Sequence, residues 1–249
     1  MKTQMIKMIV FDMAGTTVRD NNEVENCFVE AARASDLKFN VDEIISMMGW
    51  SKRQVFETLW KKNLHNEQNT IIKRKTDNSY RIFKEILEDH YTVNPVLPAE
   101  GAIELFDFLK KNKIKIALTT GFYRKVTDII LSRLGWDNGL DINYLGNNNS
   151  IIDISISSDQ VNQGRPAPDM IFRAMKMLNV SQAKGVIKIG DTPSDIQAGK
   201  NADCLLSFGV TNGTHTRDQL EKIPNDGLFK NLFEFMKYLD KTHVSPAKL

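Results

Sequence analysis

Asp12 is the first residue of the chain whose type and position suggest chemistry. It follows the mainly apolar run Ile6–Phe11 and precedes Ala14 and Gly15. A short apolar run that stops at a carboxylate and a glycine is typical of a buried parallel strand, and ligands bind at the carboxyl ends of such strands. A carboxylate placed there costs stability unless something pairs with it. Asp12 is therefore a candidate nucleophile or metal ligand, and the alternative is a carboxylate that only caps the following turn.

Polar side chains also follow other apolar runs of the chain. Thr119 and Thr120 come after Ile114–Leu118, and Asp191 comes after Gly185–Ile189. Together with Arg165, these residues would supply carboxylates, hydroxyls and one cation at a single sheet edge. A phosphoryl group needs its negative charge matched in this way while an attacking oxygen approaches.

Magnesium is the cofactor that this set of residues predicts. Asp12 and Asp191 would share Mg²⁺, which binds one or two carboxylates together with waters and substrate oxygens. The five-residue spacing from Gly185 to Gly190 is that of a P-loop, but Asp191 stands where that motif needs lysine. We therefore reject a P-loop.

The segments that must position these residues alternate between strands and helices. Strands are predicted over 6–11, 114–118, 151–157, 185–189 and, as the last one, 204–210; helices are predicted over 102–111, 126–134 and from Met170 onward. This alternation predicts the α/β class with a doubly wound parallel sheet.

A helical insertion follows the first strand. Apolar residues recur at helical spacing from about 22 to 91, and the proline-containing stretch Asn94–Pro98 reads as an extended linker. Asn40 begins one short helix that continues through Met48 and ends at Gly49. Ser51 begins the next, which places Lys52 in its first turn. We expect a core domain of residues 1–19 and 96–249 and a helical domain of residues 20–95.

Composition limits the partners and the compartment. The chain has 249 residues, 41% hydrophobic and 26% charged, with a net charge of +2. These values predict a globular protein with no attraction to nucleic acid or membranes. With no secretory signal or membrane span recognised, we expect a cytoplasmic monomer or homodimer. Cys27 and Cys204, which lie in contexts typical of a helix and a strand, are expected to be reduced and buried.

Four segments together resemble the haloacid dehalogenase superfamily of aspartate-nucleophile phosphohydrolases. They occur in the family's order and span nearly the whole chain: Asp12–Thr16, Ala117–Gly121, Gly164–Asp169 and Gly190–Asp195. The resemblance implies a Rossmann-like core, and the helical insertion is similar to the family's C1 cap, which closes over the substrate and excludes water.

The resemblance also implies a role for each matching residue. Asp12 would form an aspartyl phosphate, and the backbone carbonyl of Ala14 and the carboxylate of Asp191 would join it on Mg²⁺. Thr119 and Arg165 would hold the phosphoryl oxygens. Ala14, Gly49 and Thr120 complete the expected substrate site, and Thr16 and Asp195 would support these residues from behind.

Ala14 departs from most phosphatases of the superfamily, which carry an acid there that protonates the leaving oxygen. Losing such an acid costs a factor of roughly 10² to 10⁴. Phosphonatases have this alanine, because a cap lysine forms a Schiff base with the aldehyde and the carbon to phosphorus bond then breaks to an enamine. The segment Met48–Lys52 resembles the one that carries that lysine. We expect the start of the helix and the neighbouring Arg53 to favour the free amine of Lys52; alternatively, Lys52 only steers anions.

Two further departures from the phosphonatase pattern leave other substrates possible. Met13 replaces the usual tryptophan of phosphonatases, and Val55 stands where they have a histidine; His65 and His90 lie elsewhere in the insertion. The leading hypothesis is a Mg²⁺-dependent phosphonatase-like hydrolase acting on a small phosphonate. The alternatives are a phosphomonoesterase acting on a small metabolite and a protein that binds phosphoryl groups without catalysis.

Overall fold

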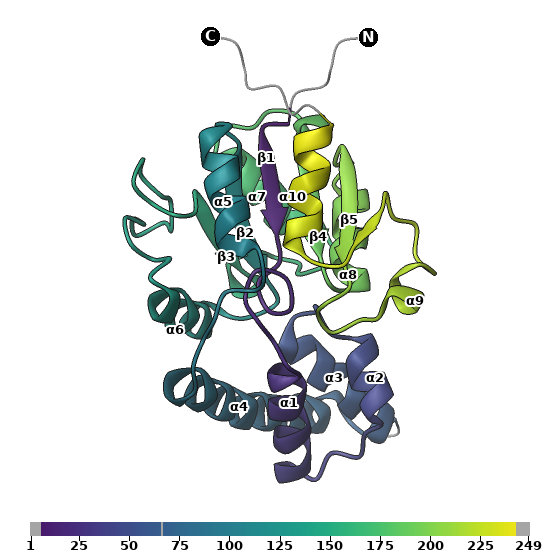
Figure 1. Cartoon of the computed structure of the whole chain (residues 1–249). Coiled ribbons are helices and arrows are strands. Elements are labelled where there is room, and N and C mark those ends of the chain that lie inside the picture. Colours follow the sequence, from purple (N-terminus) through teal and green to yellow (C-terminus); the bar gives the residue numbers. More distant parts are fainter. Residues whose placement is uncertain (1–5, 66, 243–249) are drawn as a thin grey trace.

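The computed structural model describes residues 6–65 and 67–242. Its centre is a six-stranded parallel sheet with the strand order β3-β2-β1-β4-β5-β6 (Figure 1). The strands are β1 (Met8–Phe11), β2 (Lys115–Thr120), β3 (Ile154–Ser157), β4 (Val186–Gly190), β5 (Leu206–Val210) and β6 (Leu228–Phe229). The predicted α/β class and doubly wound parallel sheet are confirmed.

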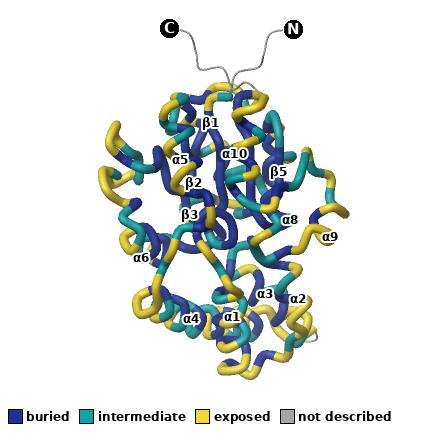
Figure 2. The backbone as a smooth tube through the Cα atoms, in the orientation of Figure 1, coloured by how far each residue is buried: buried dark blue, intermediate teal, exposed yellow. Residues whose placement is uncertain are grey.

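Both faces of the sheet are covered by helices, which explains why β1 is apolar at every position. Ile9 and Phe11 join one buried cluster, and Met8 and Val10 join the cluster on the opposite face. The first cluster contains side chains of α5 (Ala102–Lys111), α6 (Arg124–Leu134) and α10 (Leu232–Lys241). The second contains those of α7 (Asp169–Met177) and α8 (Pro193–Asn201). Figure 2 shows the buried sheet between these layers.

The insertion after β1 folds into a helical unit next to the carboxyl ends of the strands (Figure 1). Its helices are α1 (Glu23–Ala34), α2 (Val41–Ser46), α3 (Lys52–Asn63) and α4 (Asn69–Val93). Three phenylalanines from α1, α3 and α4 form its centre, with the Phe28 ring 4.3 Å from Phe56 and 4.8 Å from Phe83 between centroids. Aromatic burial of this kind supplies much of the packing energy of a small bundle.

The two connections between the helical unit and the sheet run side by side. The backbone N–H of Arg19 donates to the carbonyl of Leu97 at 3.0 Å, and that of Ala99 donates to Thr17 at 2.8 Å. Val18 and Pro98 form an isolated antiparallel bridge between the two segments. The chain therefore enters and leaves the helical unit at one place, which is the geometry of a hinge.

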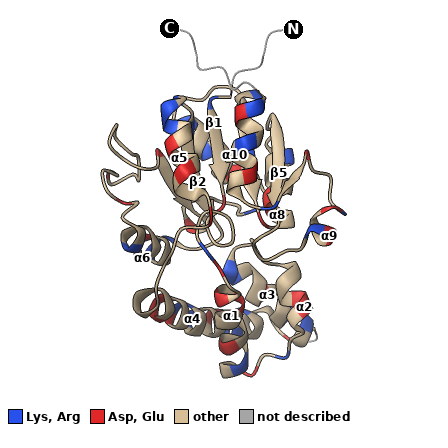
Figure 3. Ribbon diagram, viewed as in Figure 1, with Lys and Arg blue, Asp and Glu red and all other residues tan. Residues whose placement is uncertain are grey.

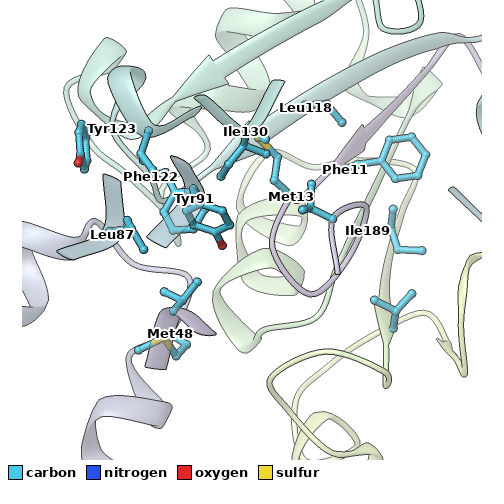
Figure 4. Close-up of a cluster of buried hydrophobic side chains, with 14 of the residues drawn as sticks. Phe11, Met13, Met48, Leu87, Tyr91, Leu118, Phe122, Tyr123, Ile130 and Ile189 are labelled. Carbon is cyan, nitrogen blue, oxygen red and sulfur yellow. The ribbon is translucent and has the colours of Figure 1, made fainter. Parts of the chain in front are cut away.

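An apolar cluster joins the helical unit to the sheet (Figure 4). Tyr91 on α4 packs against Phe122 in the loop after β2, with 5.9 Å between their ring centroids. Met48 approaches from the turn before α3, and Met13, which follows β1, lies on the side of Tyr91 nearer to Phe11. The Tyr123 hydroxyl donates to Glu88 of α4 at 2.7 Å at the edge of this contact.

Several boundaries differ from the sequence predictions. The statement that 204–210 is the last strand is wrong, because the two-residue strand β6 pairs with β5 at the sheet edge. Cys204 precedes β5 rather than lying in it, although both Cys27 and Cys204 are free and buried as predicted. The side chain of Asn40 accepts from the N–H of Asp42 at 2.8 Å, as expected of a cap, but α2 ends at Ser46 and not at Met48.

Charges of both signs are interspersed on the helices seen in Figure 3, including α5 and α10. Within the described ranges, none of the helices combines the length and apolar character needed to span a bilayer.

Candidate active site

Residues from both units line one pocket at the carboxyl ends of the strands. The sheet side supplies Asp12 and Ala14 after β1, Thr120 at the end of β2 and Arg165 from the loop before α7. The helical side supplies Lys52 and, from the turn before it, Met48 and Gly49. The structure therefore brings together most of the residues that the sequence placed at the site.

Asp12 is held by its backbone and faces a cation with its side chain. Its N–H donates to the carbonyl of Ile189 at 3.0 Å, and its own carbonyl accepts from the Thr17 hydroxyl at 2.8 Å. The Nη1 atom of Arg165 lies 2.8 Å from Oδ1 of Asp12, yet among the described residues no donor is aligned to hydrogen-bond this buried oxygen. Burial, together with the charges of Asp195 and Asp191, raises the pKa of Asp12 to about 7, although Arg165 opposes the shift.

Arg165 is fixed by a second carboxylate. It pairs with Asp195, which also lies 2.8 Å from Nζ of Lys188 and accepts from the Thr192 hydroxyl at 2.5 Å. Burial acts to raise the pKa of Asp195, but Arg165 and Lys188 outweigh it and lower that pKa to about 2. Asp195 therefore holds Arg165 in place, and its negative charge is balanced by Arg165 and Lys188.

Asp191 is enclosed by the loop after β1 and the loop after β5. Its carboxylate accepts from the Thr16 hydroxyl at 3.2 Å and from the Thr214 N–H at 2.7 Å. A Cβ on Gly15, whose φ is +81°, would lie 2.4 Å from Oδ2 of Asp191, and one on Gly213 would lie equally close. Glycine is thus required at both places for the backbone to approach this carboxylate.

The carboxylate groups of Asp12, Asp191 and Asp195 offer oxygens that all lie within 4.8 Å of one another. Asp195 is occupied by cations, whereas Asp12 keeps a buried oxygen without an aligned donor. Burial and the charge of Asp195 raise the pKa of Asp191 to about 6, so these carboxylates crowd one another without a further cation. The residues present therefore fit a divalent cation held by Asp12 and Asp191, since oxygen ligands of this kind suit Mg²⁺.

Lys52 is the first residue of α3 and is 5% exposed. Its Nζ lies 3.8 Å from Sδ of Met48 and 5.8 Å from the centre of the Phe122 ring, and no described carboxylate forms an ion pair with it. Burial and the charge of Arg165 lower the pKa of Lys52 to about 8 against the opposing effect of Asp12. The predicted influence of Arg53 is wrong, because that side chain turns outward and binds Asp77 at 2.6 Å.

The turn before α3 rests directly on the sheet loops. Gly49 has a φ of +87°, and a Cβ there would lie 2.2 Å from the Ser194 hydroxyl oxygen. A Cβ on Gly121 would lie 2.7 Å from the carbonyl oxygen of Trp50. These contacts close the helical unit over the pocket.

Other predicted residues lie beside the pocket or outside it. Thr119 is buried, but its hydroxyl donates to the Phe11 carbonyl at 3.2 Å, whereas Thr120 lines the pocket. Val55 is buried in the helical unit, and neither His65 nor His90 lines the pocket; His90 contacts Asn94 instead.

Two charged residues of the site were missed. Lys188 had a visible signal, namely a charge inside an apolar strand, which requires a buried partner. Asp20 also lines the pocket. It lies in the polar stretch between β1 and α1, and its spacing from Asp12 offered no signal.

Comparison with known families agrees with this geometry. Residues 6–203 match the family model described as haloacid dehalogenase-like hydrolase. The chain belongs to this family. It is a hydrolase of the haloacid dehalogenase superfamily, as the four segments at the strand ends predicted.

Two relatives and one solved structure are similar over most of this hydrolase. A phosphonoacetaldehyde hydrolase of Bacillus cereus (strain AH820) is 30% identical over 218 residues, which are 84% of this chain and 77% of the relative. A bifunctional phosphonoacetaldehyde hydrolase/aminoethylphosphonate transaminase of Clostridioides difficile (strain 630) is 28% identical over 240 residues, 90% of this chain. The match spans only 35% of that longer relative. A phosphonoacetaldehyde hydrolase-like protein from Oleispira antarctica has the same fold, with a TM-score of 0.73 at 18% identity over 98% of this chain and 95% of that one.

Proposed function

We propose that this hydrolase cleaves the carbon to phosphorus bond of phosphonoacetaldehyde or a closely related small phosphonate. The observation that carries the proposal is the amine of Lys52, which is buried in the same pocket as Asp12 and Arg165 and has no ion-pair partner among the residues that the structure describes. An amine in this environment is available as a nucleophile. With a pKa of about 8, roughly one molecule in ten carries it unprotonated at pH 7.

Each side of the pocket has its own role in this proposal. The amine of Lys52 adds to the aldehyde carbon, water is lost, and the resulting iminium withdraws electrons from the carbon to phosphorus bond. Asp12 then attacks phosphorus, the bond pair moves into the enamine, and an aspartyl phosphate forms. Water hydrolyses that acyl phosphate to phosphate and free Asp12. The enamine takes up a proton at carbon, and water hydrolyses the resulting iminium to acetaldehyde and free Lys52.

Asp12, the carbonyl of Ala14 and Asp191 would hold Mg²⁺ in this proposal. Bound there, the ion would offset the charge of the phosphoryl group as Asp12 approaches it. Arg165 and Thr120 would orient the phosphoryl oxygens, with Thr119 bracing the strand end behind them. Gly49 allows the turn that carries Lys52 to reach the site, and residues 20–95 would act as a cap that excludes water.

A second candidate is a phosphomonoesterase acting on a small phosphorylated metabolite. It is supported by Val55, whose aliphatic side chain stands where phosphonatases have a histidine. In that case the core chemistry on Asp12 is unchanged, and Lys52 serves only as a fixed cation.

The two candidates are separated by phosphate release from phosphonoacetaldehyde and from a panel of phosphate esters. The comparison uses the parent, Lys52→Arg and a control, Lys62→Arg, which changes an exposed lysine of the same helix that pairs with Glu43. A phosphonatase loses phosphonoacetaldehyde turnover in Lys52→Arg alone, because arginine keeps the charge but forms no Schiff base. Full activity of Lys52→Arg on this substrate would refute the leading proposal.

A further inference from the structure

Asp20 is a titratable side chain of the pocket that has no role in the chemistry above. Of the residues that line the pocket, Asp12, Asp20, Lys52 and Arg165 are titratable. Asp12 is the proposed nucleophile, Arg165 is permanently charged beside it, and Lys52 is the proposed amine. Asp20 is the remaining carboxyl group, and it lies where the first connection reaches the helical unit.

The side chain of Asp20 is anchored by backbone N–H groups. Oδ1 accepts from the N–H of Glu23 at 2.7 Å and from that of Val24 at 3.4 Å, which anchors the side chain to the start of α1. Burial and a hydrogen bond with the Glu23 side chain raise the pKa of Asp20 to about 7. A carboxyl with this behaviour holds a proton near neutral pH and can release it.

Apart from Asp12 and Lys52, whose roles are assigned above, no described residue of the pocket other than Asp20 is suited to carry this proton. Ala14 has no acidic group, Val55 is aliphatic, and His65 and His90 lie outside the pocket. The hydroxyl groups of Thr120, Thr192 and Thr214 line the pocket but are far too weakly acidic for this task.

Building on the proposed function, we propose that Asp20 is the acid–base residue of this pocket and supplies the proton that Ala14 cannot. With a phosphate ester, Asp12 attacks phosphorus, the bond from phosphorus to the leaving oxygen breaks, and Asp20 gives its proton to that oxygen. The products are an alcohol, an aspartyl phosphate and the Asp20 carboxylate. Water then attacks the aspartyl phosphate and gives a proton to Asp20, which releases phosphate and restores both side chains.

The same proton serves the aldehyde reaction. After the Lys52 amine adds to the carbonyl carbon, Asp20 protonates the carbinolamine oxygen, the carbon to oxygen bond breaks, and water leaves. The iminium on Lys52 and the Asp20 carboxylate remain.

The competing explanation is that Asp20 only anchors the start of α1. Asp20→Asn separates the two roles, because asparagine keeps an oxygen that accepts from Glu23 but carries no acidic proton. Asp42→Asn, which changes an exposed residue in the first turn of α2, is the matched control. Melting temperatures of the three proteins show whether each variant is folded.

The readout is the dependence on the leaving group. Turnover is measured with ethyl phosphate, whose alkoxide needs a proton, and with p-nitrophenyl phosphate, whose phenolate leaves without one. We expect Asp20→Asn to lose about 10² to 10⁴-fold in kcat/KM on ethyl phosphate and less than about tenfold on p-nitrophenyl phosphate. Equal losses on both esters, or none on either, would overturn the proposal.

If the enzyme turns over phosphonoacetaldehyde but neither ester, a second measurement tests Asp20. The rate of borohydride trapping on Lys52 should fall by a similar factor in Asp20→Asn and stay at the parent rate in Asp42→Asn. An unchanged trapping rate in Asp20→Asn would exclude Asp20 as the proton donor. Failure of the proposed function looks different, because the parent would then release no phosphate from phosphonoacetaldehyde, whereas the comparison of the two esters would still test Asp20.

Discussion

The two sides of the pocket differ in how their charged side chains are held. On the sheet side, Asp195 is paired with Arg165 and Lys188, and Asp191 accepts hydrogen bonds from Thr16 and Thr214. On the helical side, Lys52 lies against a thioether and an aromatic ring, and no carboxylate in the described part of the chain pairs with it. The sheet side thus presents a fixed charge pattern suited to any phosphoryl group. The helical side presents the buried amine of Lys52, and we infer that this side selects the rest of the substrate.

The largest effect is expected on the sheet side. Asp12→Asn removes the nucleophile while keeping its size, and turnover should fall by about 10⁴-fold or more. The variant should stay folded, because it also removes one of several crowded buried carboxylates. Asp107→Asn, an exposed position on α5, is the control for assays of turnover and melting temperature. Substantial turnover by Asp12→Asn would contradict the assignment of the nucleophile.

Metal removal tests the same side of the comparison. We expect a chelator to abolish turnover and added Mg²⁺ to restore it. Asp191→Ala should weaken Mg²⁺ binding by at least about 100-fold, since it removes a proposed ligand. The affinity is measured by titration calorimetry, with Asp203→Ala, an exposed carboxylate paired with Lys184, as the control. Undiminished Mg²⁺ affinity in Asp191→Ala would remove that residue from the metal site.

The contact between the two sides is tested at Gly49. Gly49→Ala forces a left-handed backbone on alanine and places its Cβ 2.2 Å from the Ser194 hydroxyl oxygen. Strain of this kind costs about 1 to 3 kcal/mol, so we expect kcat/KM to fall roughly 10- to 100-fold. Gly185→Ala is the control, because its Cβ would meet only the flexible Lys7 side chain, at 3.5 Å. Parent kinetics in Gly49→Ala would show that cap closure does not depend on this turn.

A smaller effect is expected on the helical side, in the pH dependence of the reactivity of Lys52. Because only the free amine reacts with acetic anhydride, the rate of acetylation of Lys52 should rise with pH and level off above its pKa of about 8. An unshifted lysine would keep gaining reactivity to about pH 10.4. Peptide mass spectrometry follows Lys52 and the exposed Lys62 in the same sample. A Lys52 profile that keeps rising past pH 9 would show that burial does not lower its pKa.

The local signals in the sequence account for most of the sheet side. Apolar runs that end in Asp12, Thr120 and Asp191 predict strands whose polar ends meet, because parallel strands share one carboxyl edge. The helix over 102–111 was predicted with the observed boundaries, since its apolar spacing and flanking residues are unambiguous. Strand β6 was missed because two residues carry no periodicity.

The helical side could not be predicted as fully. The sequence placed Lys52 in the first turn of a helix, but its contacts with Met48 and Phe122 depend on how the two units pack. The outward turn of Arg53 toward Asp77 depends on the neighbouring helix α4. Asp20 lines the pocket from the connection between β1 and α1, and its side chain is held there by the N–H groups of Glu23 and Val24. Contacts between segments that lie far apart in the sequence cannot be predicted from the local spacing of residue types.

The most direct test of the account asks whether Lys52 on one side and Asp12 on the other act on the same molecule. Phosphonoacetaldehyde is added together with borohydride, and the peptides are analysed by mass. The account predicts a reduced two-carbon adduct on Lys52 in the parent, after transfer of the phosphoryl group. In Asp12→Asn it predicts a heavier adduct that still carries the phosphonate, because the carbon to phosphorus bond cannot break. Absence of any adduct on Lys52 in a parent enzyme that releases phosphate from this substrate would contradict the central claim.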